Sequence, residues 1–177
     1  MKAVLVFLCL GVCALAQGKT SFAQEAVQSA RDSACGDGNV SMAVKLDDSL
    51  QPRPQPEPGK ALVYFIQDTG QGGTLVYPTT KIGIDGKWVG ANKKDSYFPV
   101  AVEPGEHHLC AAIQSSFVNS GPEFAHLTAE AGKVYYFRTR IFFAEGAAEY
   151  FSLLPVDSDE GEYLVASYPL ATAHARK

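Results

Sequence analysis

The sequence predicts a mainly β protein, an antiparallel β-sandwich of about seven to nine strands with one short C-terminal helix. Short apolar or alternating runs recur from Asn39 to Leu154, and alternation with a period of two is typical of strands with one buried face. Gly, Pro and Asp residues separate these runs. A helix-start signal follows them, where Asp157 precedes Glu160 by three residues, and predicts a helix from Ser158 to about Ala166.

The N-terminus has the pattern of a signal peptide. Lys2 supplies a positive charge, and an apolar run extends from Ala3 to Ala16, which is too short to span a bilayer as a helix. Small residues at the −1 and −3 positions allow cleavage after Ala16 or after Ala23. We therefore expect residues 1–23 to contain a signal peptide that is removed at one of these two sites, and we expect the protein to be periplasmic or extracellular.

A lipid anchor on Cys13 is the alternative to simple cleavage. Leu10 to Cys13 resembles a bacterial lipobox, but Val12 stands where that motif has Gly, Ala or Ser. The sequence contains no second apolar run of this length. We therefore expect no transmembrane segment in the mature chain.

Cleavage leaves two of the four cysteines. Cys9 and Cys13 depart with the leader, whereas Cys35 and Cys110 remain in an exported chain, where cysteines usually pair. A catalytic thiol or metal pair would need a nearby His or a Cys-x-x-Cys spacing. The sequence therefore predicts a disulfide between Cys35 and Cys110.

The mature chain divides into an N-terminal segment, residues 24–58, and a β-sandwich domain, residues 59–170. In the first segment, Gln24 to Asp32 predicts at most a short helix and Asn39 to Leu46 a strand. Alternating prolines from Pro52 to Pro58 then predict an extended strap.

Asp85-Gly86 is the strongest turn signal in the domain, because a type I′ hairpin turn needs positive φ at both central residues. The register then places Trp88 opposite Gly83 and Val89 opposite Ile82. We expect Trp88 to cover the bare backbone of Gly83, although an indole on a sheet surface also suits sugar stacking.

Two further hairpins are predicted. Ser96 to Val102 is expected to pair with His107 to Ile113 across a Pro-Gly turn, and Ala125 to Thr128 with Lys133 to Phe143. Along the predicted strand from Lys133 to Phe143, alternate side chains point into the core. The side chains between them, Tyr136, Arg138 and Arg140, point to the opposite face. That face is a candidate anion or glycan site, or its arginines are solvated or paired with acids such as Glu149.

Two family resemblances rest mainly on turn motifs. Ile84 to Gly90, followed by Glu103 to Leu109, resembles the repeat of PEGA domains, β-sandwich modules of bacterial envelope proteins. Pro58 to Tyr64, the same turns and Ala131 to Tyr136 together are similar to an exported bacterial family, domain of unknown function 2846. The resemblances imply a sandwich fold and carry no catalytic residues.

Charge and motifs argue against several functions. The formal net charge is −4, and the sequence has no basic footprint for nucleic acid. It lacks Gly-x-Ser-x-Gly, His-Glu-x-x-His, calcium-loop and dinucleotide motifs. We therefore expect a non-catalytic envelope module without cofactor or metal. The sequence does not identify its partner, for which an envelope protein and a glycan are the candidates. The alternative is a small-ligand or glycan binder that uses Trp88 or the Tyr136-Arg138-Arg140 face.

Overall fold

The computed structural model describes residues 22, 24–49, 53–69, 77–115, 120–142 and 150–176. Cys13, Ala16 and Ala23, on which the leader predictions depend, lie outside these residues, as does Glu149. Within the described part of the chain, no helix has the length and apolar character needed to cross a bilayer.

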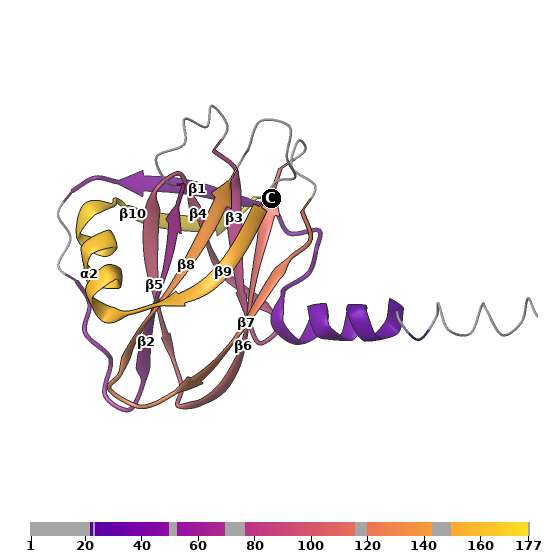
Figure 1. Cartoon of the computed structure of the whole chain (residues 1–177), viewed down its shortest axis with the longest axis horizontal. Helices are drawn as coiled ribbons and strands as arrows, with labels where there is room; N and C mark the ends of the chain where they lie inside the picture. Colours follow the sequence, from indigo (N-terminus) through magenta and orange to yellow (C-terminus); the bar gives the residue numbers. More distant parts are fainter. Residues whose placement is uncertain are drawn as a thin grey trace, which may run out of the picture.

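The strands form two sheets that pack face to face, which confirms the predicted β-sandwich (Figure 1). The first sheet has the order β1 (Met42–Asp47), β10 (Leu170–Ala175), β5 (Ser96–Val102), β2 (Ala61–Asp68), β8 (Val134–Phe142) and β9 (Tyr150–Val156). The second has the order β4 (Lys87–Lys93), β3 (Thr79–Ile84), β6 (Gly105–Gln114) and β7 (Glu123–Ala129). The β2·β8 and β10·β5 pairs are parallel, and the other pairs are antiparallel.

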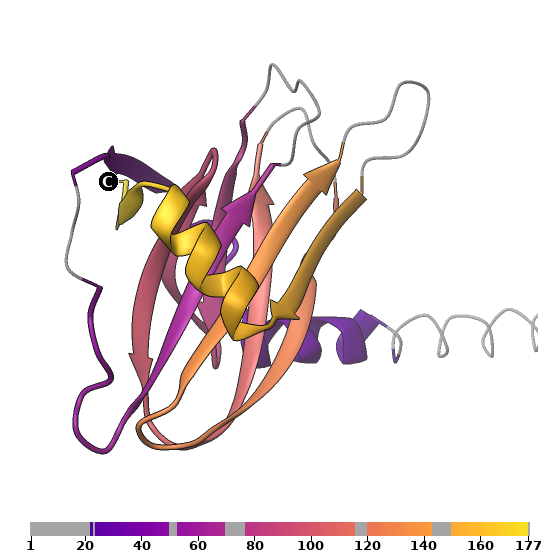
Figure 2. The same ribbon diagram turned by 60° about the vertical axis from the view of Figure 1, so that its left-hand side comes forward.

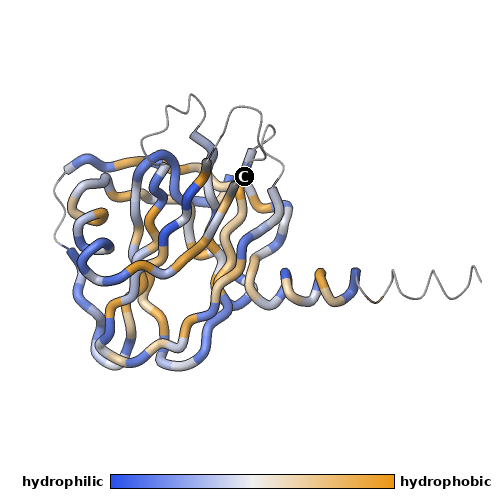
Figure 3. The backbone as a smooth tube through the Cα atoms, viewed as in Figure 1, coloured by the Kyte–Doolittle hydropathy of each residue, from blue (hydrophilic) through white to orange (hydrophobic). Residues whose placement is uncertain are grey.

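The core between the sheets is built from the faces that the alternation predicts. Phe65, Phe137 and Ile141 of the first sheet pack with Ile82 and Leu109 of the second. In Figure 3 the connections at the lower end of the sandwich are mostly hydrophilic, whereas its strands carry the apolar residues. Burial of this apolar surface is the main force that holds the two sheets together.

The Asp85-Gly86 hairpin forms as predicted, with φ values of 49° and 76° at the two turn residues. Trp88 pairs with Gly83. The predicted partner of Ile82 was wrong, because a bulge between Ile82 and Gly83 shifts the register and pairs Ile82 with Gly90. Val89 consequently lies exposed instead of in the core.

The other two predicted hairpins were wrong. β5 pairs with β2 and β10, while β6 pairs with β3 and β7, so the Pro-Gly turn connects the two sheets. The connection from β7 to β8 also crosses between sheets. Gly105, the first residue of β6, and Gly132, in the β7–β8 connection, have φ values of 137° and 77°. Glycine adopts positive φ without the strain of a side chain.

Helix α2 (Ser158–Ser167) lies across the outer face of β2 and β8 (Figure 2). It begins where predicted, since the Asp157 carboxylate accepts a hydrogen bond from the backbone N–H of Glu160 at 2.9 Å. The chain then continues into β10, which pairs with β1. The first sheet therefore extends on both sides of the range 59–170, through β1 and β10.

Candidate functional site

Tyr136, Arg138 and Arg140 lie on the outer face of β8, where α2 covers part of that face. The Tyr136 ring stacks on Tyr64, with centroids 5.3 Å apart. It also lies directly under Gly161 of α2, where a Cβ atom would come within 2.3 Å of the ring. Burial, aided by Tyr136 and Tyr97, raises the pKa of Tyr64 to about 12. Tyr136 is therefore a packing residue between sheet and helix.

The two arginines are neutralised by acids that the sequence analysis did not identify. Arg140 donates to the buried Asp68 carboxylate through Nη2 at 2.6 Å and Nε at 3.1 Å. Arg138 donates to Glu160 of α2, and its Nη1 lies 3.9 Å from Asp68. The Tyr168 hydroxyl donates to the same Asp68 at 3.2 Å. This network ties β2, β8 and the end of α2 together.

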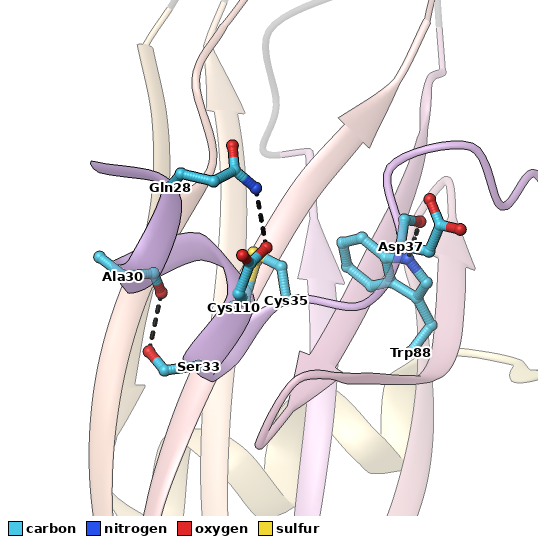
Figure 4. The surroundings of a disulfide bond; sticks show 8 residues. Gln28, Ala30, Ser33, Cys35, Asp37, Trp88 and Cys110 are labelled. Carbon is cyan, nitrogen blue, oxygen red and sulfur yellow. Dashed lines mark hydrogen bonds between the residues drawn. A yellow bond between two sulfur atoms is a disulfide. The ribbon is translucent and has the colours of Figure 1, made fainter. Parts of the chain in front are cut away.

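The predicted disulfide is present on the other side of the sandwich. Cys35 and Cys110 are bonded, with Cα atoms 5.2 Å apart and a sequence separation of 75. Cys110 belongs to β6 but lies outside the main core, in a separate cluster with Ala34 and Cys35, against which Trp88 packs. The bridge fixes the N-terminal segment to the outer face of the four-stranded sheet (Figure 4).

An α-helix covers residues 24–34 and ends at this bridge, so it is longer than the predicted segment. It projects from the sandwich (Figure 1), and residues 24–33 are exposed while Ala34 is buried. Two hairpin glycines accommodate its end: a Cβ at Gly83 would lie 2.7 Å from the Ala34 carbonyl oxygen, and one at Gly86 would lie 2.6 Å from that of Asp32. The β3–β4 hairpin is thus shaped to receive the helix.

Trp88 also contributes to the contact between the end of the N-terminal helix and the β3–β4 hairpin. Its Nε1 donates to the Asp37 carbonyl at 2.7 Å, and its ring lies where a Cβ on Gly36 would come within 2.4 Å. The Lys81 ammonium lies 4.3 Å from the ring centroid, a cation–π geometry. Trp88 therefore covers Gly83, as predicted, and also residues 36–37, which follow Cys35.

A cavity of about 560 Å³ lies between the helix and the sheet. Burial lowers the pKa of Lys81, against the opposing effect of Asp37. The Lys81 ammonium donates to the Val40 carbonyl at 2.7 Å. The polar and aromatic side chains that line the cavity include Gln28, Arg31, Asp32, Asp37, Lys81 and Trp88. This Trp88 cavity is the candidate ligand site. Cys35 and Trp88, which were predicted from the sequence, both line it, but only Trp88 was predicted as a possible ligand contact.

No group of three or more His, Cys, Asp or Glu side chains among the described residues could hold a metal ion. The Asp85–His107 pair resembles a catalytic dyad, at 2.6 Å, but the other His107 ring nitrogen lies 2.8 Å from the Glu103 carbonyl oxygen. Both ring nitrogens of His107 are thus engaged, one by Asp85 and the other by Glu103. The pair therefore links two turns of the structure.

The fold and this site define a β-sandwich that carries a disulfide, a covered Tyr-Arg face and an aromatic, polar cavity beside Trp88. The chain belongs to the family described as protein of unknown function (DUF2846), whose model matches residues 57–150. An uncharacterized protein of Haemophilus influenzae is 28% identical over 121 residues, which are 67% of this chain and 66% of that protein. No solved structure matches the chain.

Proposed function

We propose that this protein is an exported, non-catalytic module of the bacterial cell envelope that presents its N-terminal helix for interaction with another envelope component. The Cys35–Cys110 disulfide is the observation that carries the proposal, because such bonds persist in oxidising compartments and are rare in the cytosol. The signal-peptide pattern at residues 1–23 supports the same compartment.

The exposed helix supports an interaction role. Residues 24–33 are exposed, and Val27 retains 61% of its accessible surface. The bridge and the hydrogen bond from Trp88 to Asp37 fix only the end of this helix. An element anchored at one end and open along its length can be contacted without rearrangement of the sandwich. The PEGA-like turn motifs agree with a structural envelope module.

Cell fractionation with a C-terminal tag tests export. We expect the periplasm or medium to contain protein whose mass is reduced by cleavage after Ala16 or Ala23. A variant lacking residues 2–16 should remain in the cytoplasm with reduced thiols. Cys13→Ser separates simple cleavage from a lipid anchor, because it removes membrane association only if Cys13 is lipidated. Full-length cytoplasmic protein with two free thiols would contradict the proposal.

Small-ligand or glycan binding in the Trp88 cavity is the second candidate function. An indole beside Arg31, Asp37 and Lys81 offers both a stacking surface and polar partners. Glycan-array binding that is lost in Trp88→Ala, while circular dichroism shows that the sandwich is still folded, would favour this candidate. Tyr163→Ala is the matched control, because that ring is 70% exposed on α2. The Tyr136-Arg138-Arg140 face is a weaker candidate, since its groups are engaged by α2 and Asp68.

A further inference from the structure

A second cavity, of about 650 Å³, opens on the same face of the four-stranded sheet as the Trp88 cavity. Lys81 borders both, and residues 38–41 also line the second one. Among its described lining residues are the cations Lys81, Lys93 and Arg176, and no carboxylate. Acidic residues outnumber basic ones in the chain, 19 to 15, so the positive charge of this second cavity is opposite in sign to the net charge of the protein. We call this cavity the groove.

The strand register explains why these cations converge. Lys93 of β4 is paired with Thr79 of β3, and Lys81 lies two residues further along β3 on the same face. Diagonal neighbours across a sheet have Cα atoms about 7–8 Å apart, which long side chains can bridge. Arg176 is held beside them because its backbone N–H donates to the Ser41 carbonyl at 2.8 Å.

Neighbouring groups increase the positive charge. The Lys94 ammonium lies 5.5 Å from the ring centroid of Tyr77, which also lines the groove. Asp37, which acts on Lys81 electrostatically, lines the Trp88 cavity and not this one. Like charges repel one another, and a bound anion would offset that repulsion.

We propose that the groove formed by Lys81, Lys93 and Arg176 binds a small ligand through an anionic group, a carboxylate or a phosphate. Lysine ammonium and arginine guanidinium groups are the side chains that make charge-assisted hydrogen bonds to such groups. The Tyr77 ring would flank the body of the ligand, and Gln114 is already held by the backbone of Met42. This inference does not depend on export.

The proposal is tested by titrating the purified protein with inorganic phosphate and with glucuronic acid while NMR chemical shifts are recorded. Glucose is the neutral control for glucuronic acid. We expect saturable shifts at Lys81, Lys93 and Arg176 that weaken as salt is added. Lys93→Gln and Arg176→Gln should each weaken binding by about tenfold or more. Lys87→Gln is the matched control, because Lys87 lies on β4 outside the groove.

The two probes identify the source of the anionic group. Binding of phosphate alone indicates a phosphate site, whereas binding of glucuronic acid alone indicates a carboxylate carried on a ring. Either result supports the groove if the two variants bind less and Lys87→Gln does not. The proposal is overturned if neither probe shifts the groove at millimolar concentration, or if the variants bind as the parent does while their unfolding curves remain unchanged.

Discussion

Asp85 and His107 connect two turns of the sandwich through one short contact. Oδ2 of Asp85 lies 2.6 Å from Nδ1 of His107, and Oδ1 accepts the backbone N–H of His108 at 2.8 Å. Nε2 of His107 reaches the Glu103 carbonyl oxygen at 2.8 Å. The imidazole thus links the β3–β4 turn to the connection between the two sheets, and two acceptors favour its doubly protonated form.

The first prediction concerns pH. Burial lowers the pKa of His107, but hydrogen bonds to Glu103 and Asp85 outweigh this effect and raise the pKa above its ordinary value of 6.5. The stabilisation that charged His107 contributes is therefore fully present below pH 6.5, and it is lost as pH rises through the folded-state pKa of His107. The difference in unfolding free energy between parent and His107→Gln should shrink from pH 6 towards pH 9, measured by urea denaturation at roughly unit pH intervals.

Asp85, the partner of His107, loses its stabilising effect at low pH instead of at high pH. Burial raises the pKa of Asp85, but bonds from His107 and His108 outweigh it and lower the pKa below 3.8, so this stabilisation is lost as pH falls through the folded-state value. His174→Gln is the control, because His174 is an exposed residue of β10. An equal response of the two histidine variants at all pH values would contradict this role for His107.

Gly161 tests the contact between α2 and the sheet. In Gly161→Ala the new Cβ would lie 2.3 Å from the Tyr136 ring, so the helix must move. We expect a loss of about 1–3 kcal/mol in unfolding free energy, although alanine in a helix interior is otherwise better than glycine by about 1 kcal/mol. Chemical denaturation measures the change, with the exposed Glu162→Ala as control. A more stable Gly161→Ala would show that α2 does not pack closely on Tyr136.

Replacing Asp68 should lower the unfolding free energy more than replacing Glu160. The Asp68 side chain is 7% exposed, and Glu160 is 40% exposed. Asp68→Asn removes the buried counter-charge that contacts both Arg140 and Arg138, and breaking a buried ion pair typically costs about 3–5 kcal/mol. Glu160→Gln should cost about 1 kcal/mol or less. Denaturation curves of both variants provide the comparison. Equal losses would indicate that Asp68 is better hydrated than its burial suggests.

Local patterns predicted which side chains face the core but not which strands pair. The same Pro104-Gly105 chemistry can close a hairpin or connect two stacked sheets, and only tertiary packing distinguishes them. The sequence predicted α2 but not the surface it covers, so the contact of Arg140 with Asp68, 72 residues away, was not predictable. β10 is rich in alanine, a poor strand former, and its strand form follows from pairing with β1.

Reduction of the disulfide should release the N-terminal segment and leave the sandwich folded. Residues before Val40 are tethered mainly through Cys35, whereas β1 is held by its pairing with β10. Hydrogen exchange should therefore increase in residues 24–39 and stay slow in β2 and β8 of Cys35→Ser/Cys110→Ser. Unfolding free energy should fall by about 4 kcal/mol in the chain-entropy model. Loss of protection in β2 and β8 would show that the bridge supports the whole fold.

We propose that this chain folds in an oxidising compartment around the Cys35–Cys110 bridge. The most direct test of this proposal is non-reducing peptide mapping of protein taken from the native cell, with free thiols alkylated at the moment of lysis. We predict a single linked pair of peptides containing Cys35 and Cys110, and a mature N-terminus after Ala16 or Ala23. Recovery of both cysteines in alkylated form, in a chain that still begins at Met1, would contradict the account.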